Sequence, residues 1–258
     1  MIVKNSPKVS LVGAGPGDKE LLTLKALKTI EKADIILYDA LVNPEILDFS
    51  KKDIPKIFVG KRAGYKSYSQ EEINQLIVDK ALEYGHVVRL KGGDAFVFGR
   101  GKEEQNFIEN FGIDVEVIPG ISSSLAVPMS VGIPVTHRGA SNSFWVLSGT
   151  LKDGSFNKEI IEAAKSNATV VILMGINKIN EITKAYADAG KSDELIAVIS
   201  NGTLENQREV VGRIYNVQQQ IIEQKISSPA TIVIGKVVEQ ANWKKEVLEN
   251  RCESILFS

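Results

Sequence analysis

One carboxylate and one pair of cations follow strand-like segments, at positions where a catalytic or ligand-binding role is common. Asp39 follows the strand-like residues 34–38, and Lys61 with Arg62 follows residues 56–59. Open α/β sheets place functional groups at the carboxyl ends of their strands. Asp39 is therefore a candidate catalytic carboxylate or ribose ligand, although a cap of a turn or helix is an equally simple reading. The two cations, taken alone, indicate only a solvated charge pair.

The segment RLKGGDAFVFGRG, residues 89–101, combines four glycines with cations and two phenylalanines. Gly92 and Gly93 allow positive φ and a close approach of the backbone to a ligand. Asp94 could bind hydroxyl groups, and the cations could bind carboxylates or phosphates. The alternative is a plain connection from a strand to a helix. We favour a ligand-binding loop, because a plain connection does not need so many glycines and charges.

The segment VSLVGAGPGD, residues 9–18, begins like a dinucleotide-binding loop and then departs from that pattern. The fingerprint G-x-G-x-x-G requires a third glycine where this chain has Asp18. Pro16 also has no N–H group to offer a phosphate. The loop therefore argues against a pyrophosphate cradled by backbone donors and leaves its ligand open. A nicotinamide-dependent oxidoreductase stays open as an alternative, because Asp39 has about the spacing of a ribose-binding acid.

Other polar segments are less specific. The residues PGISSS, 119–124, offer hydroxyl and N–H groups at a helix start, which suits a bound carboxylate or ordinary capping. The stretches LMGIN, 173–177, and SPATIVIG, 228–235, look structural. His86 at a strand start indicates a packing residue, and His137 beside Arg138 is ambiguous.

Composition excludes several classes of protein. The 258 residues carry a net charge of -1, one cysteine and two histidines. The charge indicates neither a nucleic acid nor a membrane as partner, and an internal disulfide, a cysteine zinc cluster and a histidine-rich metal site are excluded by count. We expect no metal. The sequence also shows no transmembrane run and no signal-peptide core, which favours a reducing cytoplasm.

Alternating apolar and amphipathic segments predict the elements that must position these residues. Strands are expected at residues 9–12, 34–38, 56–59, 86–90, 114–118, 144–147, 169–174, 195–200, 209–212 and 231–235. Helices are expected at residues 19–32, 71–83, 99–111, 125–131, 158–165, 178–189 and 215–224, and Ser69 with Glu72 three residues later is a capping-box signature at the start of the second helix. In the first half of the chain this alternation favours a mainly parallel sheet covered by helices. We predict two α/β domains, 1–120 and 121–258, with the ligand in the cleft between them and a peripheral tail helix from about residue 240.

Together the motifs resemble the tetrapyrrole methylase superfamily and, within it, the uroporphyrinogen-III C-methyltransferases. The shared pieces run in family order over residues 9–238; they include LVGAGPGD, GKRAGY, RLKGGDAFVFGRG, VIPGISSS, GIPVTHRG, LMGIN, NGTLENQR and SPATIVIGKVV. Two positions depart from the family pattern, Ala95 for a proline and Lys102 for a glycine. The chain also lacks the dehydrogenase/ferrochelatase module fused to this domain in some relatives, so we expect a single-function methylase.

The resemblance implies the tetrapyrrole methylase fold, a homodimer and two successive methylations of uroporphyrinogen III that give precorrin-2. It implies S-adenosylmethionine as the cofactor, released as S-adenosylhomocysteine. The matching cofactor positions are Pro16, Gly92, Gly93, Asp94, Val97, Ser122, Ser123, Met174, Gly202 and Ala230. The matching catalytic positions are Asp39 and Lys61. As anchors for the substrate carboxylates we predict Arg62, Arg89, Lys91, Arg100 and Arg138.

Three alternatives remain. Another methylase of the superfamily would act on a later corrinoid precursor or on a non-tetrapyrrole, but GKRAGY and THRG argue against it. The nicotinamide-dependent oxidoreductase would use Asp39 to bind ribose. A binding protein without turnover would not need both Asp39 and Lys61.

Overall fold

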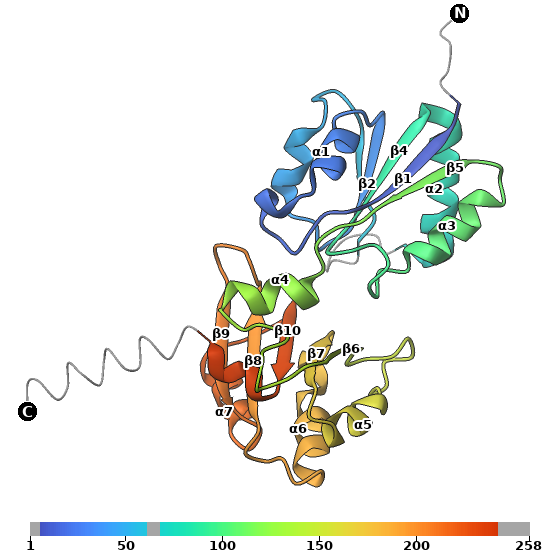
Figure 1. The fold of residues 1–258 in the computed structure, drawn as a ribbon. Coiled ribbons are helices and arrows are strands. Elements are labelled where there is room, and N and C mark those ends of the chain that lie inside the picture. Colours follow the sequence, from blue (N-terminus) through green and yellow to red (C-terminus); the bar gives the residue numbers. More distant parts are fainter. Residues whose placement is uncertain (1–5, 61–67, 242–258) are drawn as a thin grey trace, which may run out of the picture. The chain divides into compact units, whose positions relative to one another are not determined.

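A computed structural model describes residues 6–60 and 68–241. The chain divides into two compact units, Met1–Ser122 and Ser123–Ser258. Each unit contains one five-stranded sheet with helices on its faces (Figure 1). The predicted tail helix from about residue 240 falls almost wholly outside the described residues.

Unit 1 is built on a parallel sheet, as the alternation of strands and helices predicted. The strand order is β3-β2-β4-β1-β5, and every neighbouring pair is parallel. Strands buried on both faces consist of nearly continuous apolar runs, which the three inner strands β2, β4 and β1 show. The strands are β1 (Lys8–Gly13), β2 (Ile35–Tyr38), β3 (Lys56–Phe58), β4 (His86–Lys91) and β5 (Asp114–Ile118).

Helices cover both faces of this sheet. On one face α1 and η2 pack with Ile36, Val88 and Leu90, and on the other α2 and α3 pack with Val9 and Leu37. The capping box predicted at the start of α2 is present. The helical elements are η1 (Lys19–Leu21), α1 (Leu24–Ile30), η2 (Pro44–Phe49), α2 (Gln70–Tyr84) and α3 (Gly101–Glu109).

The single helix predicted over residues 19–32 is wrong. The chain forms the short 3-10 turn η1 and then starts again as α1. Asp18 accepts a hydrogen bond from the N–H of Glu20 at 2.9 Å, and Thr23, with extended backbone, accepts one from Ala26 at 3.2 Å. Two capping side chains five residues apart therefore begin two helical segments, and periodicity alone does not show the break.

The topology of unit 1 places a ligand position at one edge of its sheet. From β1 the chain crosses through α1 to β2 on one side, and from β4 it crosses through α3 to β5 on the other. Neighbouring β1 and β4 therefore form a topological switch point, and open α/β sheets bind ligands outside the carboxyl ends of the strands there. At the carboxyl ends of the strands, Pro16 follows β1, Asp39 follows β2, and Gly92 and Asp94 follow β4.

Unit 2 contains a mixed sheet in the order β6-β7-β10-β8-β9. Only β6 and β7 pair in parallel, whereas β10 runs antiparallel to β7 and β8, and β9 runs antiparallel to β8. Buried runs do not encode strand direction, so the sequence did not reveal this difference. The strands are β6 (Phe144–Ser148), β7 (Thr169–Leu173), β8 (Leu195–Ser200), β9 (Arg208–Arg213) and β10 (Ala230–Ile234).

Helices also cover both faces of the second sheet. One core holds α5, α6 and α7 against it, and another holds α4 and η4. The helical elements are α4 (Ser123–Ser130), α5 (Glu159–Lys165), η3 (Ile176–Lys178), α6 (Ile179–Asp188), α7 (Val217–Glu223) and η4 (Lys236–Gln240). Within residues 6–60 and 68–241, no helix has the length and apolar character needed to cross a lipid bilayer.

Candidate active site

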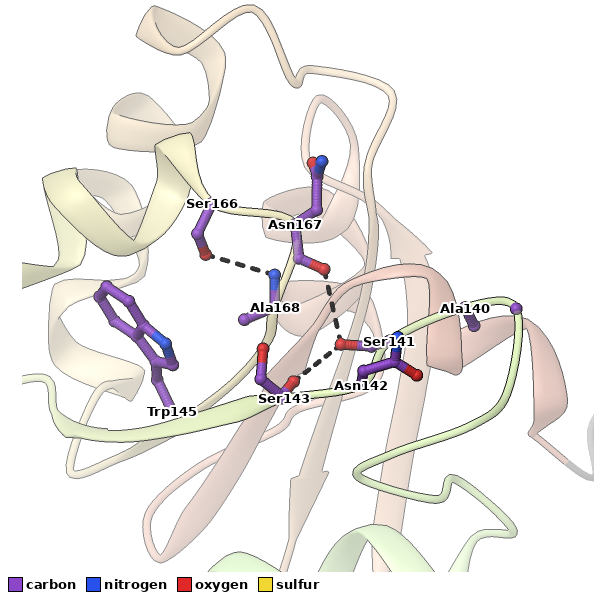
Figure 2. A pocket seen from close by; sticks show the side chains of 9 residues that line it. Ala140, Ser141, Asn142, Ser143, Trp145, Ser166, Asn167 and Ala168 are labelled. Carbon is purple, nitrogen blue, oxygen red and sulfur yellow. Dashed lines mark hydrogen bonds between the residues drawn. The ribbon is translucent and has the colours of Figure 1, made fainter.

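A pocket of about 520 Å³ lies in unit 2 at the amino ends of β6 and β7, lined by small polar residues and Trp145 (Figure 2). Its hydroxyl groups bond within the chain. Ser141 Oγ accepts from the N–H of Thr169 at 3.0 Å, and Ser166 Oγ donates to the carbonyl of Ala163 at 2.9 Å. None of the predicted site residues lines this pocket. Its polar groups therefore mainly close the amino ends of two strands.

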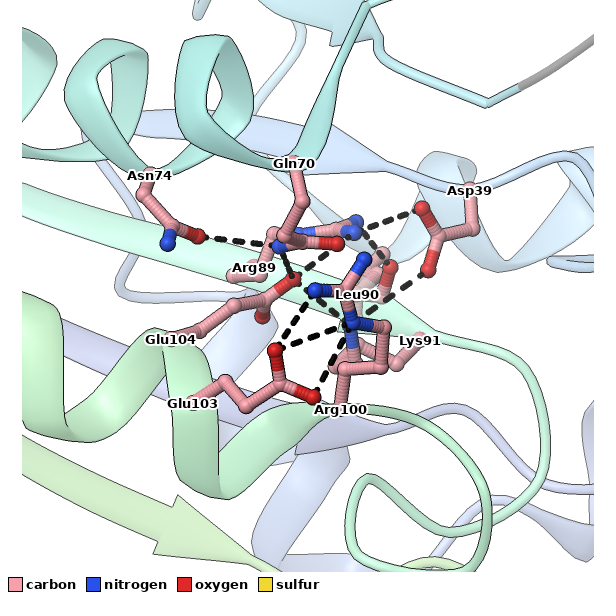
Figure 3. A network of polar contacts seen from close by, with 9 residues as sticks. All are labelled: Asp39, Gln70, Asn74, Arg89, Leu90, Lys91, Arg100, Glu103 and Glu104. Atoms are coloured by element: carbon pink, nitrogen blue, oxygen red, sulfur yellow. Dashed lines mark hydrogen bonds and ion pairs between the residues drawn. The ribbon is translucent and has the colours of Figure 1, made fainter. Parts of the chain in front are cut away.

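Asp39 lies at the carboxyl end of β2 beside two cations of the neighbouring strand β4 (Figure 3). Arg89 Nη2 donates to Asp39 Oδ1 at 2.6 Å, and Lys91 Nζ lies 3.8 Å from Asp39 Oδ2. The Asp39 side chain is 28% exposed, whereas those of Arg89 and Lys91 are 2% and 5% exposed. Each oxygen of a partly exposed carboxylate thus faces a buried cation.

Glu104 of α3 is the buried carboxylate of this charge network. Its Oε1 accepts from Lys91 Nζ at 2.8 Å, from Arg89 Nη2 at 3.3 Å and from Gln70 Nε2 at 3.0 Å. The Glu104 side chain is fully buried. Sequence reasoning missed it. The available signal was its position four residues before buried Ile108, because a carboxylate on the apolar face of a helix requires a buried partner.

Two cations and two carboxylates balance one another in this network. Burial and the neighbouring Arg89 charge lower the pKa of Lys91. Burial also opposes the charge of Arg89, but Glu104 and Asp39 outweigh it and raise the pKa of Arg89. Both cations are directed toward carboxylates of the chain itself. Their burial argues against the predicted role of Arg89 and Lys91 as anchors for substrate carboxylates.

Glycines allow the loop after β1 and the loop after β4 to approach each other closely. The N–H of Gly15 donates to the carbonyl of Gly93 at 3.1 Å, and the N–H of Gly93 donates to the carbonyl of Gly15 at 2.7 Å. A Cβ added at Gly120 would lie 2.3 Å from the Gly93 carbonyl oxygen. Because the amides of Gly15 and Gly93 are bonded to each other, they do not form a cradle for a phosphate, and Pro16 offers no N–H.

Asp94 fixes the glycine-rich loop that follows β4. Its Oδ1 accepts from the N–H of Phe96 at 2.8 Å, and its Oδ2 accepts from the N–H of Gly120 at 3.1 Å. The next residues expose apolar surface, with 50% of Phe96, 36% of Val97 and 46% of Phe98 accessible. Exposed apolar side chains grouped beside a polar edge are typical of a ligand-binding surface.

In unit 2 the predicted cofactor positions converge on one edge of the sheet. Met174 follows β7, Gly202 lies just beyond β8, and Ala230 begins the antiparallel strand β10. The register pairs Ala230 with Ser200, and the next residue of β10 with Leu173. Strand ends that are far apart in the sequence therefore lie side by side, at the edge opposite the pocket of Figure 2.

Backbone strain gathers at this same edge. Met174 has φ 56°, Asn201 has φ 50° and Thr203 has φ 70°, all in the left-handed region that residues other than glycine seldom adopt. A Cβ added at Gly202 would lie 2.4 Å from a methyl group of Val127 in α4. Strained conformations of this kind cluster at ligand sites. Met174 and Thr203 are not residue types that favour this conformation, so the sequence did not indicate it there.

The remaining predicted residues are dispersed. Ser122 is buried at the end of unit 1, and Ser123 begins α4. Arg100 is exposed and pairs with Glu103 at 2.5 Å. Arg138 lies in the exposed turn between the bridged residues 137 and 141, near the amino edge of the second sheet and away from Met174. Two predicted residues lie outside the described part of the chain, Lys61 and Arg62.

The described residues contain no group of three histidine, cysteine or acidic side chains placed to hold a metal ion. Unit 1 carries a network of charged side chains at one edge of its sheet, and unit 2 carries a neutral, strained set of strand ends at one edge of its own sheet.

Comparison with known proteins identifies the family of this chain. The family described as "Tetrapyrrole (Corrin/Porphyrin) Methylases" matches residues 8–218. The uroporphyrinogen-III C-methyltransferase of Methanocaldococcus jannaschii is 46% identical over 234 residues, which cover 90% of this chain and 96% of that protein. A siroheme synthase of Actinobacillus pleuropneumoniae is 45% identical over an alignment that covers 95% of this chain. The chain spans about half the length of that synthase, 54%.

Solved structures show the same relationship. The uroporphyrin-III C-methyl transferase of Thermus thermophilus, complexed with S-adenyl homocysteine, has a TM-score of 0.78 and 38% identity over 90% of this chain and 99% of its own. A cobalt precorrin-4 methyltransferase has a TM-score of 0.81 at 24% identity, which shows a shared fold. The family match, the identity and the two-sheet fold agree, and this chain belongs to the tetrapyrrole methylase family.

Proposed function

We propose that this protein transfers methyl groups from S-adenosylmethionine to two carbon atoms of uroporphyrinogen III, giving precorrin-2 by way of precorrin-1. The support is similarity to uroporphyrinogen-III C-methyltransferases over 90% of the chain. The observation that carries the proposal is Asp39, a partly exposed carboxylate held by two buried cations at the carboxyl edge of the parallel sheet.

The residues fit S-adenosylmethionine better than a dinucleotide. A dinucleotide needs free backbone amides for its pyrophosphate, but those of Gly15 and Gly93 bond to each other. When bound, S-adenosylmethionine supplies an electrophilic methyl group on sulfur and needs no phosphate cradle. The residues proposed to hold it are those implied by the resemblance: Pro16, Gly92, Gly93, Asp94, Val97, Ser122, Ser123, Met174, Gly202 and Ala230.

Asp39 supplies the charge that the reaction needs. A pyrrole carbon that gains a methyl group leaves a cationic ring, which must then lose a proton. A fixed carboxylate beside that ring stabilises the positive charge or accepts the proton. Lys61, the second proposed catalytic residue, would act as an acid or hold a substrate carboxylate.

The substrate carries a carboxylate on every side chain, so it needs exposed cations. Among the predicted anchors, Arg100 and Arg138 are exposed, and arginine suits bidentate contact with carboxylates. We keep Arg100, with Arg62, as the proposed anchors, because Arg138 lies at the edge of the second sheet away from Met174. Phe96 and Phe98 would cover the macrocycle with their exposed rings. A homodimer, implied by the resemblance, and a cytoplasmic location, favoured by the sequence composition, remain predictions.

Two assays test the proposal. Incubation with uroporphyrinogen III and methyl-labelled S-adenosylmethionine should give a product that carries two labelled methyl groups by mass spectrometry. Calorimetry should show S-adenosylhomocysteine binding and no tight binding of NAD. Tight NAD binding without methyl transfer would favour the oxidoreductase, whose Asp39 would be a ribose ligand.

A further inference from the structure

We propose that Glu104 is a positioning residue for Asp39, acting through Arg89 and Lys91; the inference rests on the proposed function, in which Asp39 is catalytic. Arg89 Nη2 bonds to both carboxylates, at 2.6 Å to Asp39 and 3.3 Å to Glu104. Lys91 Nζ lies 2.8 Å from Glu104 and 3.8 Å from Asp39. Two cations therefore link a fully buried carboxylate to a partly exposed one (Figure 3).

Glu104 is too deep to bind a ligand itself. Its side chain is 0% exposed, compared with 28% for Asp39. Gln70 and Asn74 of α2 extend the network behind it, because Gln70 Nε2 donates to Glu104 Oε1 at 3.0 Å and to Asn74 Oδ1 at 2.9 Å. The carboxylate is thus fixed from α2 and from β4, and any effect on the reaction has to pass through the two cations.

The charge balance explains why an anion is needed at this depth. Without Glu104, two buried cations would share the single negative charge of Asp39. Buried cations without compensating charge are unfavourable. Lys91, whose pKa is already lowered by burial and by Arg89, would then lose its proton more readily. The contact to Asp39 Oδ2 would weaken, and the carboxylate would turn toward Arg89 alone.

Stability alone does not account for this cluster. Two of its buried polar atoms, Glu104 Oε2 and Arg89 Nε, have no hydrogen-bond partner among the described residues. A partly satisfied buried ion network is often no more stable than packed apolar side chains of the same volume. What the network does achieve is a fixed direction for Asp39, and a displacement of about 1 Å in a reacting group can lower a rate ~100-fold.

A double-mutant cycle between Asp39→Asn and Glu104→Gln tests the proposal. Glu104→Gln keeps the size and the acceptor and removes the charge. In the wild-type background we expect kcat for methyl transfer to fall by about 10- to 100-fold, with unchanged affinity for S-adenosylhomocysteine by calorimetry. In the Asp39→Asn background the same change should have almost no further effect, because its target is already gone. The matched control is Glu109→Gln, an exposed charge on the same helix, which should leave kcat unchanged.

The remaining outcomes distinguish a failure of the proposed role of Asp39 from a failure of the positioning role of Glu104. Full activity of Asp39→Asn would overturn the proposed role of Asp39. An unchanged kcat in Glu104→Gln, or an equal loss in both backgrounds, would overturn the positioning role alone. If Glu104→Gln does not fold, Glu104→Asp replaces it in the cycle, since it keeps the charge and withdraws the carboxylate by one methylene. We expect Glu104→Asp to lower kcat less than the loss given for Gln and again only when Asp39 is present, and wild-type kcat would overturn the proposal.

Discussion

The ligand edges of the two sheets are made from different groups. In unit 1, the edge carries Asp39 over Arg89, Lys91 and Glu104, all within 3.8 Å of an oppositely charged partner. In unit 2, the proposed cofactor positions are neutral, and they share strained backbone at Met174 and on both sides of Gly202. One edge depends on side-chain charge and the other on main-chain shape.

This difference indicates a division of work within the proposed function. Stabilising or moving charge in a transition state requires charged groups that are held in place before the reaction. Binding a cofactor through backbone groups requires particular φ angles and close packing, which small or neutral residues provide. The charged network around Asp39 should therefore govern turnover, whereas the neutral edge of unit 2, like the glycine loops of unit 1, should govern affinity for the cofactor.

The largest effect should come from Asp39→Asn. The change is nearly isosteric and removes only the charge, so we expect kcat to fall by about 10²- to 10⁴-fold, the usual range for general acid–base catalysis. Affinity for S-adenosylhomocysteine should stay the same. Steady-state kinetics with calorimetry measures both. If the variant instead loses affinity for the cofactor and keeps normal turnover at saturating cofactor, Asp39 is a ribose ligand. The charged edge of unit 1 would then govern affinity and not turnover.

The next effect should come from the packed glycines of unit 1. A Cβ at Gly120 would lie 2.3 Å from a backbone oxygen of Gly93 and 2.6 Å from backbone carbon of Gly13. Backbone cannot move aside as a side chain can, so Gly120→Ala should lower the free energy of unfolding by about 3 kcal/mol. Urea unfolding measures this loss.

Gly112→Ala is the matched control for Gly120→Ala. Gly112 has φ 71° and open space around it, so the substitution should cost only the ~1–2 kcal/mol of a left-handed residue. Equal losses in the two variants would show that the two loops of unit 1 are less tightly joined than their geometry indicates.

A smaller effect should follow from Gly202→Ala in unit 2. The added Cβ would lie 2.4 and 2.6 Å from the methyl groups of Val127, so α4 must shift. We expect a loss of about 1–2 kcal/mol of stability and an approximately tenfold weaker affinity for S-adenosylhomocysteine. The kcat at saturating cofactor should remain. Gly154→Ala, at φ 83° with free space, controls for backbone strain alone, and a fall in kcat for Gly202→Ala would contradict the division of work.

The smallest effect concerns His86, at the amino edge of the first sheet. Its Nε2 lies 2.8 Å from Ser10 Oγ, and burial, partly opposed by the bond to Lys32, lowers its pKa. The unfolded chain therefore binds a proton more readily, so His86 stabilises the fold above its unfolded pKa of about 6.5, and that stability is lost as the pH falls below it.

Urea unfolding between pH 7 and pH 5 tests this sign. His86→Gln should flatten the slope of the free energy of unfolding against pH. His137→Gln, which removes an exposed histidine, should leave that slope unchanged. Glu116 adds to the slope at lower pH. Its bonds to Lys25 and Lys8 lower its pKa to about 2, so its contribution is lost as the pH falls from its ordinary value toward 2. A slope that survives in His86→Gln at pH 6 would assign the effect to another group.

Much of the fold could be predicted from the sequence, because apolar periodicity determines which segments are buried. Strands 114–118 and 195–200 were predicted with the bounds that the structure has, and the capping box of α2 was predicted from Ser69 and Glu72. The break near Thr23 was missed because caps override periodicity. The mixed second sheet was missed because burial does not encode direction.

The site was only partly predictable for a related reason. Asp39 and the glycine loops could be found from residue type and position. Glu104 could not, since its role depends on three donors from α2 and β4 that only the fold brings together. Arg89 and Lys91 were assigned to the substrate because a sequence shows charge and not burial. The left-handed backbone at Met174 likewise has no signature in the residue type.

The double variant Asp39→Asn/Gly202→Ala tests the division between the two edges most directly. Its kcat and its dissociation constant for S-adenosylhomocysteine should be measured beside those of the wild type and both single variants. If the edges act separately, the double variant should show the kcat of Asp39→Asn and the affinity of Gly202→Ala, each within about twofold. A double variant whose kcat falls well below that of Asp39→Asn, or whose cofactor affinity falls well below that of Gly202→Ala, would contradict the account.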